Sequence, residues 1–151
     1  MAEKQVITVR VVVAESASLP LYATEYAAGA DLCAWLPDRT ITLKEHGGQA
    51  LIPTGVMLEI PSGYEGQVRP RSGLAAKHGV TVLNSPGTID SDYRGEVKVI
   101  LINHGSQPFV ISHGQRIAQL ILAPVIQGRF IEVETITATN RGGRGFGSTG
   151  V

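Results

Sequence analysis

The sequence predicts an all-β protein: a jelly-roll-like β-sandwich with one short helix and a flexible, glycine-rich C-terminal tail. Its 18 glycines and 8 prolines are spread along the 151 residues and divide the chain into short runs rich in Val, Ile and Leu. Several runs alternate apolar and polar side chains, which is the pattern of a strand that buries one face. Only one segment has helical character. Short strands that recur between turn signals are typical of two sheets packed face to face.

The predicted strands follow from these runs in chain order, with Gly, Pro and polar residues marking the turns between them. They cover residues 6–13, 30–35, 39–44, 50–60, 66–70, 95–103, 119–125 and 129–134. The helical segment runs from Ser72 to Gly79. It is limited to about two turns, because a glycine ends it.

A chain of this length is most simply one domain. We place the β-sandwich in residues 1–136 and the tail in residues 137–151 of the same domain. The tail has five glycines and no apolar periodicity, so it cannot bury enough surface to order itself. We therefore expect it to be mobile when nothing is bound.

Charge and motif content exclude several classes of protein. The 13 basic and 13 acidic residues balance to zero, so the chain as a whole does not attract nucleic acid or anionic membranes. The single cysteine, Cys33, together with the lack of a signal peptide or a long apolar run, indicates a reducing compartment and a cytoplasmic protein. The histidines lack the spacing of a zinc site, and the usual acyl-transfer, P-loop and dinucleotide motifs are missing.

Polar residues gather in five segments, of which the first two are short. In "AGADL" (28–32), Asp31 taken alone is more often a turn or capping acid. In "RPRSGLAAKHG" (69–79), Ser72 could be a helix N-cap. Equally, Arg71, Ser72 and the main-chain amide of Gly73 could form a cradle for phosphate oxygens.

The third segment, "VLNSPGTIDSDYRGEVKV" (82–99), predicts a loop of about a dozen residues between two short strands, larger than a minimal turn. It could be a solvated hairpin tip or a functional loop. The fourth, "GQRIAQL" (114–120), places Gln119 in an apolar strand, where a buried amide needs a partner. The fifth is the tail, in which Arg141, Arg144 and Phe146 form either a loose end or an arginine and aromatic flap.

In their order and spacing these five segments resemble the five motifs of the trimeric dUTPase family, the deoxyuridine 5′-triphosphate nucleotidohydrolases. The resemblance covers residues 28–150, and "NSPGTIDSDYRGE" and "RGGRGFGSTG" carry most of its specificity. Two positions depart from the family pattern. Gln115 stands where an acidic residue is commoner, and Arg144 stands where glycine is usual.

The resemblance implies hydrolysis of dUTP to dUMP and pyrophosphate by a water that attacks the α-phosphorus, with Mg²⁺ bound to the triphosphate. Asp90 matches the catalytic aspartate, which orients the water and accepts its proton. Asp31 would reach the metal through water. The remaining phosphate-binding positions implied are Arg71, Ser72, Gly73 and Gln119.

Selectivity is also implied by the resemblance. Tyr93 would pack against the deoxyribose and exclude a 2′-hydroxyl, and Phe146 would stack over the uracil. The uracil would be read largely by main-chain groups at Asn84, Gly87, Thr88, Ile89, Asp90 and Lys98. The terminal phosphates would be bound by Arg141, Gly147 and Ser148, so that the tail closes the site. The family further implies a homotrimer with active sites between subunits.

Two other functions stay open from the sequence. A dCTP deaminase of the same fold would carry a glutamate in the base pocket and would lack the "DSDYRGE" loop. A β-sandwich that binds single-stranded nucleic acid through an RGG-like tail is a non-enzymatic alternative. One short copy of the tail motif and the zero net charge argue against it.

Overall fold

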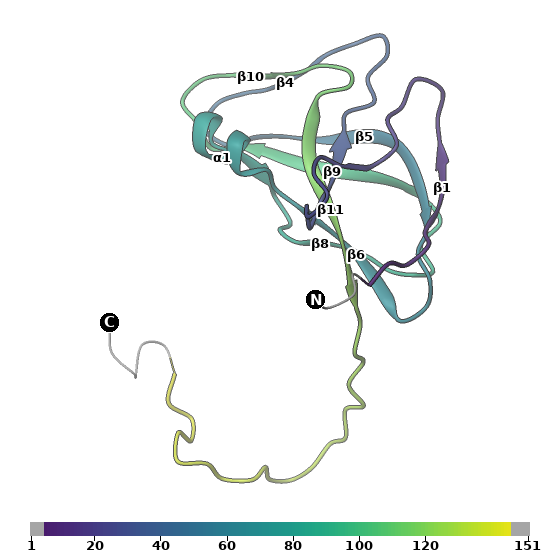
Figure 1. Ribbon diagram of the computed structural model, residues 1–151. Coiled ribbons are helices and arrows are strands. Elements are labelled where there is room, and N and C mark those ends of the chain that lie inside the picture. The colour runs from purple at the N-terminus through teal and green to yellow at the C-terminus, as the bar shows by residue number, and fades with distance from the viewer. Residues whose placement is uncertain (1–4, 146–151) are drawn as a thin grey trace.

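The computed structural model describes residues 5–145 and forms a β-sandwich with a long C-terminal extension (Figure 1). In chain order the elements are β1 (Arg10–Val13), β2 (Leu21–Tyr22), β3 (Ala30–Cys33), β4 (Ile41–Leu43), β5 (Gly48–Glu59), β6 (Tyr64–Arg69), α1 (Ser72–His78), β7 (Val80–Val82), β8 (Gly87–Ile89), β9 (Glu96–Asn103), β10 (Phe109–Ile111) and β11 (Arg116–Pro124). The predicted fold class is confirmed.

The strands form three sheets. One has four strands in the order β1-β5-β9-β7, another has five in the order β2-β3-β11-β6-β8, and β10 pairs with β4 alone. All the pairings are antiparallel. Non-consecutive neighbours such as β9 and β5 bring distant segments together, so the site is assembled from several parts of the chain.

The core lies between the two larger sheets and follows from the alternation of side chains along each strand. In β9, Val97, Val99 and Leu101 are buried, whereas Lys98 between them is exposed. Since successive side chains of a strand point to opposite faces, one face of β9 packs into the core. The other face is free to border a binding site.

The buried end of β9 carries a polar side chain that joins three segments. Asn103 is 0% exposed, and its Nδ2 donates to the carbonyl oxygens of Leu43 (3.2 Å) and Gln107 (2.8 Å). Its Oδ1 accepts a hydrogen bond from the Gly105 amide at 2.9 Å. The amide thus fixes β9 to β4 and to the turn before β10.

The sequence predicted most strands correctly but not all of them. The strand predicted at 129–134 is wrong: no strand forms there, and Phe130 is 98% exposed. Its alternating pattern has no neighbouring strand to pair with. The loop of about a dozen residues predicted within the segment 82–99 is interrupted by β8, while β2 and β10 have only two and three residues, too few for a periodicity to show.

After β11 the chain leaves the sandwich. Residues 125–145 contain no helix or strand, and Figure 1 shows them running away from the sheets. Within residues 5–145, no helix has the length and apolar character needed to cross a membrane.

Candidate active site

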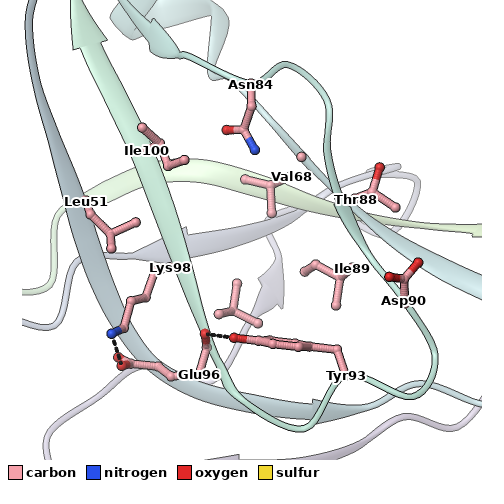
Figure 2. Close-up of a pocket in the computed structure, with 12 residues that line it drawn as sticks. Leu51, Val68, Asn84, Thr88, Ile89, Asp90, Tyr93, Glu96, Lys98 and Ile100 are labelled. Atoms are coloured by element: carbon pink, nitrogen blue, oxygen red, sulfur yellow. Dashed lines mark hydrogen bonds and ion pairs between the residues drawn. The ribbon is translucent and has the colours of Figure 1, made fainter.

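A pocket of about 380 Å³ lies between the exposed edge of β9, the strand β8 and the loop that follows β8 (Figure 2). Its walls include seven of the positions that were expected to hold the base and the sugar: Asn84, Gly87, Thr88, Ile89, Asp90, Tyr93 and Lys98. We call this the base pocket.

One wall of the base pocket is tightly packed around a glycine. A Cβ at Gly87 would lie 3.2 Å from Nδ2 of Asn84 and 3.3 Å from Cβ of Val68, closer than ordinary van der Waals contact. Gly87 pairs with Val68 at the start of β8, so its main chain is held in place by β6. The close approach of Asn84 therefore depends on the missing side chain.

The opposite wall presents main-chain groups that have no hydrogen-bond partner among residues 5–145. The Ile100 carbonyl accepts a hydrogen bond from the Leu83 amide at 2.8 Å, so the main chain of residue 100 faces β7. Because main-chain groups alternate between the two sides of a strand, the N–H and C=O of Lys98 face the same way. Since β7 ends at Val82, they point toward the base pocket. The main chain of Lys98 is therefore accessible from the base pocket.

Asp90 and Tyr93 lie on the loop after β8. The Asp90 carbonyl accepts the Tyr93 amide at 3.1 Å, which closes a tight turn between them. Figure 2 shows the Tyr93 ring reaching across the foot of the pocket to Glu96, whose carbonyl accepts its hydroxyl at 3.0 Å. Arg94 stabilises the loop by donating to the Ser91 carbonyl (2.7 Å) and the Tyr93 carbonyl.

A second hollow, of about 340 Å³, lies at the ends of β3 and β11 and the start of α1, and we call it the cationic pocket. Asp31 is placed there between two guanidinium groups. Its Oδ1 is 3.3 Å from Nε of Arg71, and its Oδ2 is 3.3 Å from Nη1 of Arg116. Arg71 also donates to the Arg116 carbonyl at 3.3 Å. Two cations therefore flank one carboxylate.

Arg116 was not among the residues expected from the sequence. The sequence feature that could have identified Arg116 is its position in "GQRIAQL", three residues before Gln119 and at the start of a strand. A cation there is readily taken for a solvated surface residue. Only the pairing of β11 with β3, which places Arg116 beside Cys33 and Gln119 beside Asp31, shows that it borders the cationic pocket.

The start of α1 also lies at the cationic pocket. Ser72 is the first residue of the helix, and the N-cap is Arg71 with no side-chain capping hydrogen bond, so the N-cap interpretation of Ser72 is wrong. Amides of a first helical turn have no acceptor within the helix. A Cβ at Gly73 would meet nothing within 4 Å, so the main chain there is accessible.

Gln119 is the fourth predicted residue at the cationic pocket. Its Nε2 donates to the Pro70 carbonyl at 3.0 Å, which supplies the partner that a half-buried amide needs. Gly29 leaves room for it, since a Cβ there would lie 2.5 Å from Oε1 of Gln119. The amide is thereby fixed between the first two polar segments.

Comparisons with known proteins agree with this geometry. Residues 15–150 match the family model described as dUTPase. A deoxyuridine 5′-triphosphate nucleotidohydrolase of Beijerinckia indica subsp. indica is 60% identical over 97% of this chain and 91% of that protein. One of Rhizobium rhizogenes is 59% identical over 88% of this chain and 85% of that protein. The chain belongs to the dUTPase family.

Solved structures with a similar fold also belong to dUTPases. The dUTPase of Staphylococcus bacteriophage 80alpha, solved with dUpNHpp, superimposes with a TM-score of 0.83 at 26% identity, over 95% of this chain and 99% of that chain. The resemblance identified from the five motifs is confirmed. The chain is a hydrolase of nucleotide metabolism, and this favours an enzyme over the nucleic-acid-binding alternative.

Membership of the dUTPase family does not mean that one chain assembles the whole site. Among residues 5–145, no residue lines both the base pocket and the cationic pocket. Arg141 lies on the exposed extension, where its Nε donates to the Arg144 carbonyl at 3.0 Å, and it lines neither pocket. The expected positions Phe146, Gly147 and Ser148 lie outside the described residues.

Proposed function

We propose that this enzyme hydrolyses dUTP to dUMP and pyrophosphate, which lowers dUTP and supplies dUMP for thymidylate synthesis. The observation that carries the proposal is the base pocket, which gathers a carboxylate, an aromatic ring and unpaired main-chain groups from three segments. The names of the 60% and 59% identical relatives support the same substrate.

Asp90 orients the attacking water and accepts its proton. The water oxygen bonds to the α-phosphorus, and the bond from that phosphorus to the bridging oxygen breaks, releasing pyrophosphate. Phosphoryl transfer needs little covalent help from the protein, so alignment of the water is the main contribution. A positioned general base typically accelerates such a step by about 10²–10⁴-fold.

The cationic pocket binds the phosphate chain. Arg71, Ser72 and the Gly73 amide hold the α- and β-phosphates, with Gln119 as a further donor, and these groups offset charge that develops on the phosphate oxygens. Mg²⁺, when bound, would supply further compensation for that charge. Asp31 would hold this ion through water, because Mg²⁺ prefers carboxylate oxygen and keeps several of its waters.

Selectivity arises in the base pocket. The main-chain slot formed by Asn84, Gly87 and Lys98 fits uracil, so a thymine methyl clashes with it. Cytosine reverses the donor and acceptor pattern and leaves buried groups unpaired, which is the larger penalty. Tyr93 packs against the deoxyribose and leaves no room for a 2′-hydroxyl.

We further propose a homotrimer with active sites between subunits. The separation of the base pocket from the cationic pocket on one chain supports this, since a nucleotide needs both. In such an assembly the tail closes a neighbouring site, with Phe146 over the uracil and Arg141, Gly147 and Ser148 at the terminal phosphates. The enzyme acts in the cytoplasm and uses no nucleic acid or membrane partner.

Incubation of the purified protein with Mg²⁺ and dUTP, dCTP, UTP or dTTP in turn tests the proposed activity. Pyrophosphate from dUTP alone is the expected result. Ammonia from dCTP would instead identify the deaminase, and no turnover of any of the four would leave the nucleic-acid-binding module as the explanation.

A further inference from the structure

Gly95 lies between Arg94 and β9, and its main-chain conformation does not require a glycine. Its φ angle lies outside the left-handed region that favours glycine, so other residues could adopt the same conformation. A Cβ at this position would nevertheless lie 2.4 Å from Oη of Tyr93, 2.6 Å from Cζ and 3.0 Å from Cε2. The Tyr93 ring occupies the space that a side chain at residue 95 would need.

The ring is fixed at both ends. The loop that carries it is held by Arg94, which donates to the Tyr93 carbonyl at 3.0 Å. Its hydroxyl donates to the Glu96 carbonyl at 3.0 Å. That carbonyl lies two residues before Lys98, so it belongs to the same unpaired edge of β9 that borders the base pocket.

The residue that accepts the tyrosine hydroxyl is itself tied to the sandwich. Oε1 of Glu96 accepts the Gly55 amide at 2.9 Å, and Oε2 lies 3.7 Å from Nζ of Lys98. Gly55 lies in the irregular stretch of β5 between Pro53 and Val56, where a Cβ would lie 2.6 Å from Cβ of Ala17. The acceptor of the Tyr93 hydroxyl is therefore held against β5, while Tyr93 itself is 46% exposed.

We propose that Gly95 is a specificity-determining position, because the absence of its side chain lets Tyr93 lie against the start of β9 and so sets the floor of the sugar subsite. The proposal rests on the proposed function of Tyr93. Ordinary contacts begin near 3.4 Å, so a methyl group at residue 95 displaces the ring by about an ångström. The displaced ring either enters the base pocket or loses its bond to Glu96, and both changes spoil its fit to deoxyribose.

The test compares kcat/KM for dUTP and for UTP in wild type and in Gly95→Ala. The deoxyribose of dUTP loses its contact with the ring, whereas UTP does not make that contact and changes little. We expect the dUTP to UTP ratio to fall by roughly tenfold or more, the effect of misplacing about one methyl group in a fitted pocket. Gly128→Ala is the control, because the nearest atoms to its Cβ would be Phe130 carbons at 3.5 Å or more, and its ratio stays at the wild-type value.

A double-mutant cycle shows whether Gly95 acts through Tyr93. In a Tyr93→Ala background the ring is gone, so adding Gly95→Ala leaves the ratio unchanged. A further fall in that background, or an unchanged ratio in the single variant, would overturn the proposal. If Gly95→Ala does not fold, Tyr93→Phe tests the same anchor: a lowered ratio supports the proposal and an unchanged ratio overturns it.

The outcome for wild type separates this inference from the proposed function. Wild-type enzyme that turns over dUTP and rejects UTP, with Gly95→Ala doing the same, contradicts only the role of Gly95. Wild-type enzyme that does not hydrolyse dUTP, or hydrolyses UTP equally well, contradicts both.

Discussion

At the scale of single residues, Asp90 and Asp92 show why position rather than residue type assigns chemistry. Both are exposed carboxylates on the loop after β8, yet only Asp90 lines the base pocket. The two can therefore serve as a matched pair of variants.

Asp90→Asn keeps the shape of the side chain but removes the base. We expect kcat to fall by about 100-fold or more while dUTP still binds, because only the proton acceptor is lost. Steady-state kinetics and binding of a non-hydrolysable analogue measure the two effects. Asp92→Asn should keep near-normal kcat, and an equal loss in both variants would show that the loop charge as a whole, not Asp90, matters.

Arg116 is a positioning residue for Asp31 in the cationic pocket. Its side chain is 55% exposed, so the ion pair itself contributes less than about 1 kcal/mol to stability. We expect Arg116→Ala to lower kcat/KM about tenfold, mainly through KM. The reason is that Asp31 and Arg71, which contact Arg116 in the cationic pocket, lose their alignment. Thermal unfolding should change little.

Arg10→Ala is the control for Arg116→Ala. Arg10 forms a comparable exposed pair, with its Nε 3.3 Å from Glu59, and lines neither the base pocket nor the cationic pocket. The Arg10→Ala variant should therefore keep the wild-type kcat/KM. A fall of the same size in both variants would mean that loss of any surface cation weakens binding, and Arg116 would have no particular role.

At the scale of elements, the end of β9 depends on one buried amide. Asn103→Ala leaves the Leu43 and Gln107 carbonyls and the Gly105 amide without their partner. We expect the free energy of unfolding to fall by about 2 to 4 kcal/mol in urea denaturation, since buried unpaired groups are costly.

Gln107→Ala is the matched variant for this element, because only the main chain of Gln107 takes part in the contact and its side chain is exposed. Gln107→Ala should change the free energy of unfolding by no more than about 0.5 kcal/mol. Equal losses in the two variants would show that the turn before β10, rather than the amide of Asn103, determines stability there.

The elements also show where sequence reasoning succeeded and where it did not. Long alternating strands such as β5 and β9 were predicted because each buries one face, and periodicity reports burial directly. The strand predicted at 129–134 has the same alternation but no pairing partner in the described part of the chain, and pairing cannot be read from a single segment. β8 was missed because it has three residues inside a polar loop.

At the scale of the whole molecule, the separation of the two pockets leads to a complementation experiment. We expect co-expressed Asp90→Asn and Arg71→Ala chains to form mixed trimers that recover activity, although each variant alone is poorly active. If each site takes Asp90 from one subunit and Arg71 from another, random mixing restores about one quarter of the sites. Differently tagged chains allow the mixed trimers to be purified and assayed. No recovery in mixed trimers would place both residues of a site on one chain.

The sequence by itself determined the fold class, the five polar segments and the family, because these depend on local patterns: burial periodicity, turn residues and motif order. It also placed Asp90 and Tyr93 together, since they are three residues apart. Tertiary structure alone decided that Arg116 flanks Asp31, that Tyr93 fills the space beside Gly95, and that the main chain of Lys98 is unpaired. Each of these depends on which strand lies next to which and where a pairing ends, and pairing is a long-range property that no single segment encodes.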